Sequence, residues 1–167
     1  YNTSIYEKNE YKSAAYVAKL LVDIVSKNGN LLLSVPLRAD GTFDEKEEKI
    51  LNEFGAWMNI NKEAIYDTRP WVVFGEGPIV EEDIPLNAQG FNEGSYSQAG
   101  AKEIRFTQTP KYLYATVLAW PVDGKVNIKS LAANSKLYEG KIRKVELLGY
   151  GKVDFVRTAE GLSVTLP

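Results

Sequence analysis

The stretch Asn30-Leu31-Leu32-Leu33-Ser34-Val35-Pro36 decides how the first part of this chain must fold. Four of its seven residues are large aliphatics, and they do not alternate with polar residues. A short, continuous apolar run between turn signals is typical of a strand that is buried on both faces, as in a parallel sheet covered by helices. Such a strand needs neighbours on its edges, because its backbone N–H and C=O groups must be hydrogen-bonded. The surrounding sequence therefore has to supply further strands.

A helix, and not a strand, is predicted on each side of the leucine run. Apolar residues recur at helical spacing from Lys12 to Lys27, and Asp23 is assigned to the polar surface of that helix. Asn28-Gly29 then supplies a stop, because glycine accepts the left-handed conformation that closes a helix. A second helix is predicted over about residues 44–59, with a capping-box-like start at Asp44.

Residues 1–69 offer no second strand of the kind that the leucine run requires. We therefore expect this region to be the end of a larger α/β domain that begins upstream. The alternative is a small helical pair over an ordinary edge strand. The chain opens Tyr1-Asn2-Thr3 without the pattern of a signal peptide. It also lacks an initiator Met, which predicts that residue 1 is not the natural start.

The remainder of the chain has a different pattern, so a domain boundary is predicted at Thr68-Arg69-Pro70, giving domains 1–69 and 70–167. Closely spaced strand patterns with turns between them are typical of an antiparallel β-sandwich. The strands are predicted at about 71–74, 103–108, 111–120, 125–131, 141–148, 152–157 and 162–166. Residues 79–102 show no period and are predicted to form a loop.

The strand at 111–120 is apolar on both of its faces, which predicts a central position in a sheet. One face carries Tyr112, Tyr114 and Trp120, whose rings could stack on the apolar faces of sugars. The alternative is that these aromatic residues belong to the sandwich core or to a domain interface.

The composition excludes several kinds of chemistry. The 167 residues include 20 Lys plus Arg against 22 Asp plus Glu, and the near-neutral balance of −2 gives no basic footprint for nucleic acid. The chain holds no His and no Cys, which removes disulfides, thiolate metal sites and the Ser-His-Asp triad. The acidic residues Glu76 and Glu81-Glu82-Asp83 match no ordered metal-binding loop, so no metal is predicted. No run of about 18 apolar residues is present, so no membrane span is expected.

Several blocks, in a fixed order, resemble the C-terminal portion of the family 29 glycoside hydrolases, the α-L-fucosidases. The ordered set from Val22 to Leu33 and from Arg38 to Thr42 is the most specific part. The full set is Tyr1-Asn2, Tyr11 to Ala14, Leu21 to Leu33, Arg38 to Thr42, Asn61 to Trp71, Gly75 to Pro78, Ile104 to Thr107 and Leu113 to Ala115.

The resemblance implies a (β/α)8 barrel followed by a β-sandwich. Residues 1–69 would then be the C-terminal remnant of the catalytic barrel, with its eighth strand near Leu31–Val35, and 70–167 the sandwich. The expected fold class is α+β as a fragment: two helices and one buried strand, followed by an antiparallel β-sandwich.

The resemblance also implies a retaining hydrolase that uses an Asp nucleophile and a Glu acid/base and needs no cofactor. The nucleophile's motif lies upstream of the blocks found here, so no catalytic residue is assigned and the chain alone is expected to be inactive. The implied partners are the remainder of the barrel and, through it, a fucosylated glycan. Secretion or periplasmic export is common for such enzymes, while the sequence itself defines no compartment.

Barrel active sites lie at the C-terminal ends of the strands. Tyr1, Asn2, Arg38 and Asp40 would follow two such ends, and the resemblance makes them candidate substrate-binding residues. For Arg38 and Asp40 the alternative is a pair that stabilises a turn. A different class of function also stays open, namely a glycan-binding or purely structural β-sandwich module.

Overall fold

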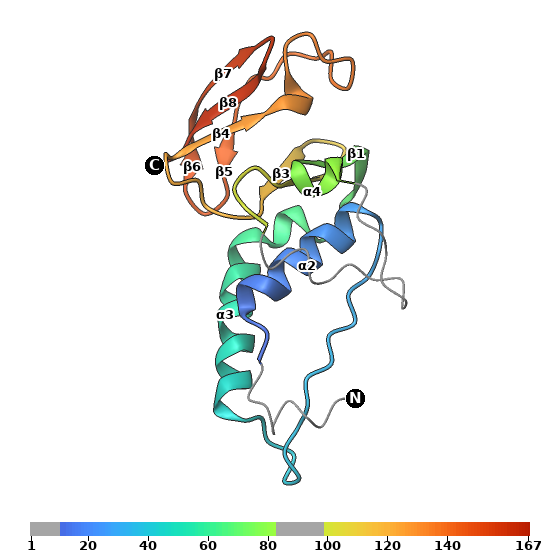
Figure 1. Ribbon diagram of the computed structural model, residues 1–167, viewed down its shortest axis with the longest axis vertical. Helices are drawn as coiled ribbons and strands as arrows, with labels where there is room; N and C mark the ends of the chain where they lie inside the picture. The colour runs from blue at the N-terminus through green and yellow to red at the C-terminus, as the bar shows by residue number, and fades with distance from the viewer. Residues whose placement is uncertain (1–10, 83–98) are drawn as a thin grey trace.

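The computed structural model describes residues 11–82 and 99–167, and these form two long helices, shorter helical turns and several antiparallel sheets (Figure 1). The expected mixed α+β fold class is confirmed. The helical elements are α2 (Ala14–Ser26), α3 (Glu45–Asn61), η1 (Lys62–Ala64), α4 (Pro78–Glu81) and η3 (Lys129–Leu131). The strands are β1 (Arg69–Glu76), β2 (Ile104–Gln108), β3 (Leu113–Val117), β4 (Lys125–Ile128), β5 (Glu146–Leu147), β6 (Gly151–Lys152), β7 (Asp154–Thr158) and β8 (Gly161–Thr165).

Both long helices begin where a side chain accepts hydrogen bonds from free backbone amides, and they end where backbone amides donate to carbonyls of the last turn. The Ser13 side chain accepts a hydrogen bond from the Tyr16 amide at the start of α2. At its end, the amide of Gly29 donates to the Ile24 carbonyl at 2.8 Å, and Asn28 has a φ of 66°. The predicted helices over 12–27 and 44–59 are therefore confirmed within two residues at each end. No helix in the described ranges is both long and apolar enough to cross a membrane.

The sheets form two layers, and the helices add a third. One sheet has the order β1-β2-β3 and faces a second with the order β4-β8-β7; β5 and β6 form a small hairpin. Ile104 and Phe106 from the first sheet meet Val126 and Leu162 from the second in one core cluster. The helices lie on the other side of the first sheet, so this sheet is covered on both faces (Figure 1). Residues of both sheets therefore form one core, as expected for a β-sandwich.

Strand β3 is not central in its sheet, contrary to the sequence-based expectation for 111–120. It is an edge strand, and β2 lies between it and β1. The expectation failed because apolar residues on both faces of a strand indicate only that other layers cover those faces. They do not indicate how many strands lie beside it in the sheet. Leu113 packs into the sandwich core, whereas Leu118, just beyond β3, packs against Leu20 and Val22 of α2.

The leucine run is not a buried strand in this chain, and this corrects the expectation for Leu31–Val35. Residues 30–38 have no assigned secondary structure, and the segment runs as a single extended trace between α2 and α3 (Figure 1). Leu32 is 95% exposed and Leu33 is 39% exposed. Within the described residues no backbone hydrogen bond pairs this segment with a strand. The physical reason is the one that the sequence suggested, because a strand that is buried on both faces cannot form without neighbours.

The apolar face of α3 is also incompletely covered. Its only buried residue is Glu47, while Phe54 and Trp57 are half-buried and stack on each other with ring centroids 6.3 Å apart. The predicted division at residue 70 falls at the start of β1, which pairs with β2 of the sandwich. The division into two domains stays a prediction.

Candidate functional site

The residues Arg38 to Thr42 form a tight, exposed turn. The amide of Arg38 donates to the Thr42 carbonyl at 2.8 Å, and the amide of Gly41 donates to the Arg38 carbonyl at 2.9 Å. Asp40 accepts from the Thr42 hydroxyl at 2.7 Å and from its amide at 3.0 Å. These bonds to Thr42 hold the pKa of the Asp40 carboxyl below its ordinary value. The geometry matches the turn-stabilising alternative for Asp40.

A role for Arg38 and Asp40 in substrate binding stays a prediction. Both side chains lie in an exposed turn that continues the unpaired leucine segment. The other two candidates, Tyr1 and Asn2, lie outside the described residues. Of the four predicted residues, the structure therefore describes only Arg38 and Asp40, which lie in one turn.

Of the three predicted aromatic residues, the structure brings two together. The rings of Tyr112 and Tyr114 lie with centroids 6.4 Å apart and planes tilted by 60°. Trp120 follows the end of β3 and, among the described residues, has no ring contact with either tyrosine. Tyr112 is 58% exposed and Trp120 is 61% exposed, so neither belongs to the sandwich core.

Tyr114 is tied to the helical layer. Its hydroxyl donates to the Glu63 carboxylate at 2.7 Å. Desolvation and the neighbouring Glu63 carboxylate raise the pKa of Tyr114 to about 12. Tyr112 and Tyr114 thus present two rings beside a carboxylate that accepts hydrogen bonds, and a sugar-stacking role for them stays a prediction.

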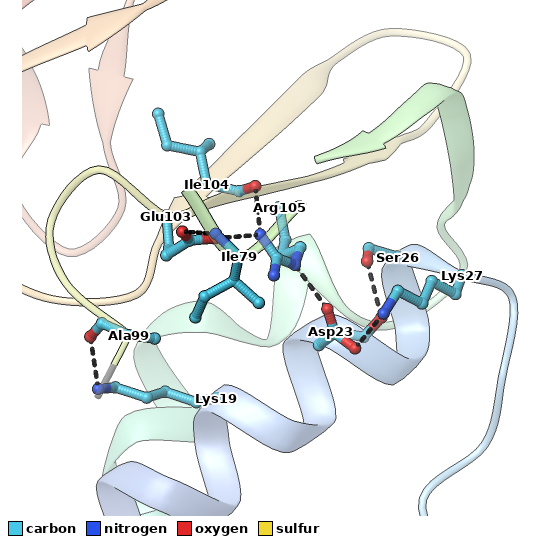
Figure 2. Close-up of polar contacts among 9 residues, drawn as sticks. All are labelled: Lys19, Asp23, Ser26, Lys27, Ile79, Ala99, Glu103, Ile104 and Arg105. Atoms are coloured by element: carbon cyan, nitrogen blue, oxygen red, sulfur yellow. Dashed lines mark hydrogen bonds and ion pairs between the residues drawn. The ribbon is translucent and has the colours of Figure 1, made fainter. Parts of the chain in front are cut away.

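The most deeply buried charged side chains in the described part of the chain form a cluster between α2 and the first sheet (Figure 2). The Arg105 guanidinium donates from Nε to the Asp23 carboxylate at 2.6 Å and from Nη1 to the Glu103 carboxylate at 3.1 Å. The side chains of Arg105, Asp23 and Glu103 are only 1%, 6% and 2% exposed. Sequence reasoning placed Asp23 on the polar surface of its helix, and this was wrong.

Further contacts surround the cluster. Lys27 donates to the second Asp23 oxygen at 2.7 Å, and the Ile79 amide donates to Glu103 at 2.6 Å (Figure 2). The Lys27 ammonium and the Arg105 guanidinium also lie 4.8 Å and 5.8 Å from the centre of the Phe74 ring. Burial lowers the pKa of Arg105, but the hydrogen bonds and charges of the two carboxylates outweigh it, so the pKa is raised.

These contacts determine what the cluster can do chemically. Asp23 and Glu103 are enclosed and occupied by cationic or amide donors, so neither is placed to attack a substrate or to exchange a proton with one. They instead join helix α2 to strand β2, since Asp23 and Arg105 are 82 residues apart in the sequence. A signal was present in the sequence, namely an arginine in the middle of the apolar strand Ile104-Arg105-Phe106.

Two models of known families match the chain. Residues 1–63 match the model described as alpha-L-fucosidase. Residues 98–167 match the model described as the alpha-L-fucosidase C-terminal domain.

Curated relatives give the same picture. The plasma alpha-L-fucosidase of Homo sapiens is 28% identical over 163 residues, which is 95% of this chain and 29% of the relative. The tissue alpha-L-fucosidase of Mus musculus is 30% identical over 149 residues, covering 88% of this chain and 27% of the relative. The chain therefore spans less than a third of the length of these relatives.

Solved structures with the same fold come from the same family. The Thermotoga maritima alpha-fucosidase in complex with fucose superposes with a TM-score of 0.66 at 25% identity, covering 95% of this chain and 31% of that one. Alpha-L-fucosidase isoenzyme 1 from Paenibacillus thiaminolyticus gives a TM-score of 0.62 at 26% identity, covering 94% and 31%.

Proposed function

The chain belongs to the α-L-fucosidase family and corresponds to its C-terminal portion, and on this premise we propose that it is part of a retaining hydrolase of α-L-fucosides. In this proposal residues 1–69 complete the catalytic barrel, and residues 70–167 form the accessory sandwich. The partner of the chain is then the remainder of the barrel, through which the enzyme binds a fucosylated glycan.

The observation that carries the proposal is the state of the leucine run. Leu32 is 95% exposed in a segment whose composition fits a strand buried on both faces. Within the described residues the segment has no strand beside it. A longer chain that supplies neighbouring strands accounts for both facts, and the matched relatives are more than three times as long as the matched region.

The chemistry proposed for the longer enzyme needs two carboxylates about 5 Å apart across the scissile bond. Asp23 and Glu103 meet at Arg105, but they are buried and neutralised there. We therefore place the nucleophile outside this chain, and we expect the chain alone to be inactive. No cofactor enters the proposed reaction.

The turn from Arg38 to Thr42 belongs to this proposal as part of the site wall. It follows the leucine run, and barrel enzymes build their sites from the loops at the C-terminal ends of strands. In the longer enzyme the Arg38 side chain would be a donor for sugar hydroxyls, while Asp40 keeps the turn closed through Thr42. Tyr1 and Asn2 are assigned to the same wall.

The experiment compares residues 1–167 with the full natural protein from which they come. A mass spectrum of the source protein establishes whether upstream sequence belongs to it. Both proteins are then assayed for release of the aryl group from an aryl α-L-fucoside. The full protein should turn the substrate over with retention at the anomeric carbon, and residues 1–167 should not. Turnover by purified residues 1–167 would contradict the placement of the nucleophile.

A second candidate function is favoured by the exposed aromatic residues. Tyr112 and Trp120 are more than half exposed in the chain as it stands. A sandwich that binds glycans independently of catalysis would use them. Binding to a glycan array should then be lost in Tyr112→Ala or Trp120→Ala. It should persist in Tyr150→Ala, a control that removes an equally exposed ring (64%) from another part of the sandwich.

A further inference from the structure

Three of the sequence blocks that carry the family resemblance meet at the buried charge cluster. Asp23 comes from the block Leu21 to Leu33, and Arg105 from the block Ile104 to Thr107. The block Gly75 to Pro78 lies against them, because the end of β1 pairs with Ile104 and Arg105. None of these residues is used in the chemistry proposed above, so the blocks need a separate explanation.

The two glycines of the middle block make room for the cluster. A Cβ atom at Gly75 would lie 2.6 Å from the Ile104 carbonyl oxygen and 2.8 Å from Cδ of Arg105. At Gly77, where φ is 130°, a Cβ atom would lie 2.6 Å from the Lys102 carbonyl oxygen and 2.7 Å from Cδ of Glu103. Any other residue at either position would displace the backbone of residues 102–105, which presents Glu103 and Arg105.

The charges within the cluster are balanced, with Asp23 and Glu103 against Arg105 and Lys27. A buried ion pair of this kind need not stabilise a fold more than apolar residues would. Removing one partner is nevertheless strongly destabilising, because the other charge then stays buried without compensation. The charges of the cluster are therefore paired only when α2 and β2 are both folded and packed against each other. The cluster also contacts the helix at one defined point, since Asp23 lies three residues before the end of α2 at Ser26.

We infer that Asp23, Glu103 and Arg105 form a latch that positions helix α2 on the sheet β1-β2-β3 and fixes where the chain leaves α2 toward residues 31–42. Arg105 is a positioning residue in this arrangement, because it acts through Asp23 on the helix. An apolar contact of Leu20 and Val22 with Leu118 joins the same two layers. The experiment must therefore separate the charges from the apolar contact.

A double-mutant cycle does so. The folding equilibrium constant of residues 1–167 is measured by urea denaturation for Asp23→Asn, Arg105→Gln and the double variant. Each single change should lower the constant at least about 100-fold, because it leaves the buried cluster with one charge that is not compensated, although Asp23 keeps Lys27 and Arg105 keeps Glu103. The double variant should lose much less than the product of the two, with a coupling of about tenfold or more.

The exposed pair Lys49 and Glu53 is the matched control. Its Nζ–Oε1 distance is 3.8 Å, and the side chains are 76% and 54% exposed. The same cycle with Lys49→Ala and Glu53→Ala should give a coupling of about threefold or less. Coupling at Asp23 and Arg105 no larger than in this control would overturn the latch.

The variant Arg105→Lys tests the two-armed geometry. Lysine keeps the positive charge, but it lacks the fork that reaches Asp23 and Glu103 together. Its folding constant should fall between those of the unchanged chain and of Arg105→Gln. Full recovery by lysine would show that one charge suffices and would overturn the positioning by two carboxylates.

A measurement on the unchanged chain covers the case in which a variant does not fold. Hydrogen exchange of the amides at residues 22–26 should be as slow as that of β2, within about tenfold, although helix ends normally open early. Exchange in this last turn of α2 more than about 100-fold faster than in β2 would overturn the inference. It would show that no latch holds the end of the helix.

Discussion

Replacing Gly77 with alanine tests the packing of the first sheet against the charge cluster. The φ of 130° at Gly77 lies in a region that L-residues rarely adopt, and holding alanine there costs about 1–3 kcal/mol. The added Cβ would also lie 2.6 Å from the Lys102 carbonyl oxygen, so backbone must move. We expect a total loss of about 2–4 kcal/mol in the free energy of unfolding, since both effects act at one site.

Urea denaturation followed by tryptophan fluorescence and circular dichroism measures this loss. The midpoint should fall on the order of 1–2 M for a chain of this size. Gly55→Ala is the control, because Gly55 lies inside α3 and a Cβ atom there meets nothing within 4 Å. That change should stabilise the chain by about 0.5–1 kcal/mol. Equal midpoints for the two variants would show that position 77 accepts a Cβ atom without strain or displacement of the backbone.

Three further outcomes are expected. Phe106→Ala should lower the free energy of unfolding by about 3–5 kcal/mol in the same denaturation assay, because the ring is 0% exposed in the sandwich core; a loss below about 1 kcal/mol would contradict the assigned core. Folding raises the pKa of Tyr114 from 10.0 to about 12, so its stabilisation is present below pH 10 and is lost as the pH rises toward 12. Absorbance titration should therefore lose the tyrosine step near pH 12 in Tyr114→Phe, and Glu63→Gln should move that step to lower pH; an unchanged step in both variants would count against the hydrogen bond. Folding lowers the pKa of Asp44, first through the Tyr11 hydroxyl at 2.6 Å, so its stabilisation is present above its ordinary 3.8 and is lost as the pH falls below that value; an NMR titration should show the Asp44 midpoint move up in Tyr11→Phe, and no movement would exclude that cause.

The local elements could be predicted from the sequence because their signals are local. Asp44 and the Asn28-Gly29 pair mark helix ends through contacts within a few residues, and the helices begin and end near those positions. The strands after Glu103 follow the same logic, with turns between them. The order of strands in the sheet was harder, because it depends on contacts between distant segments, and β3 was wrongly assigned to the centre.

The charge cluster could not be predicted for a related reason. The spacing of Asp23 in its helix is that of a surface residue. It is buried because it contacts Arg105, which is 82 residues away in the sequence. The family resemblance, in contrast, was visible because it depends on ordered blocks of residues and not on their contacts. It identified the family, while the positions of substrate-binding residues stay predictions.

The leucine run offers the most direct measurement of the central claim, that this segment requires strands from outside the chain. Hydrogen exchange by mass spectrometry can follow the amides of residues 31–35 in the chain alone and in the full natural protein. We predict exchange near the rate of an unstructured peptide in residues 1–167 and strong protection in the longer protein. Protection in residues 1–167 equal to that of β2 would contradict it, since the segment would then have found its partners within this chain.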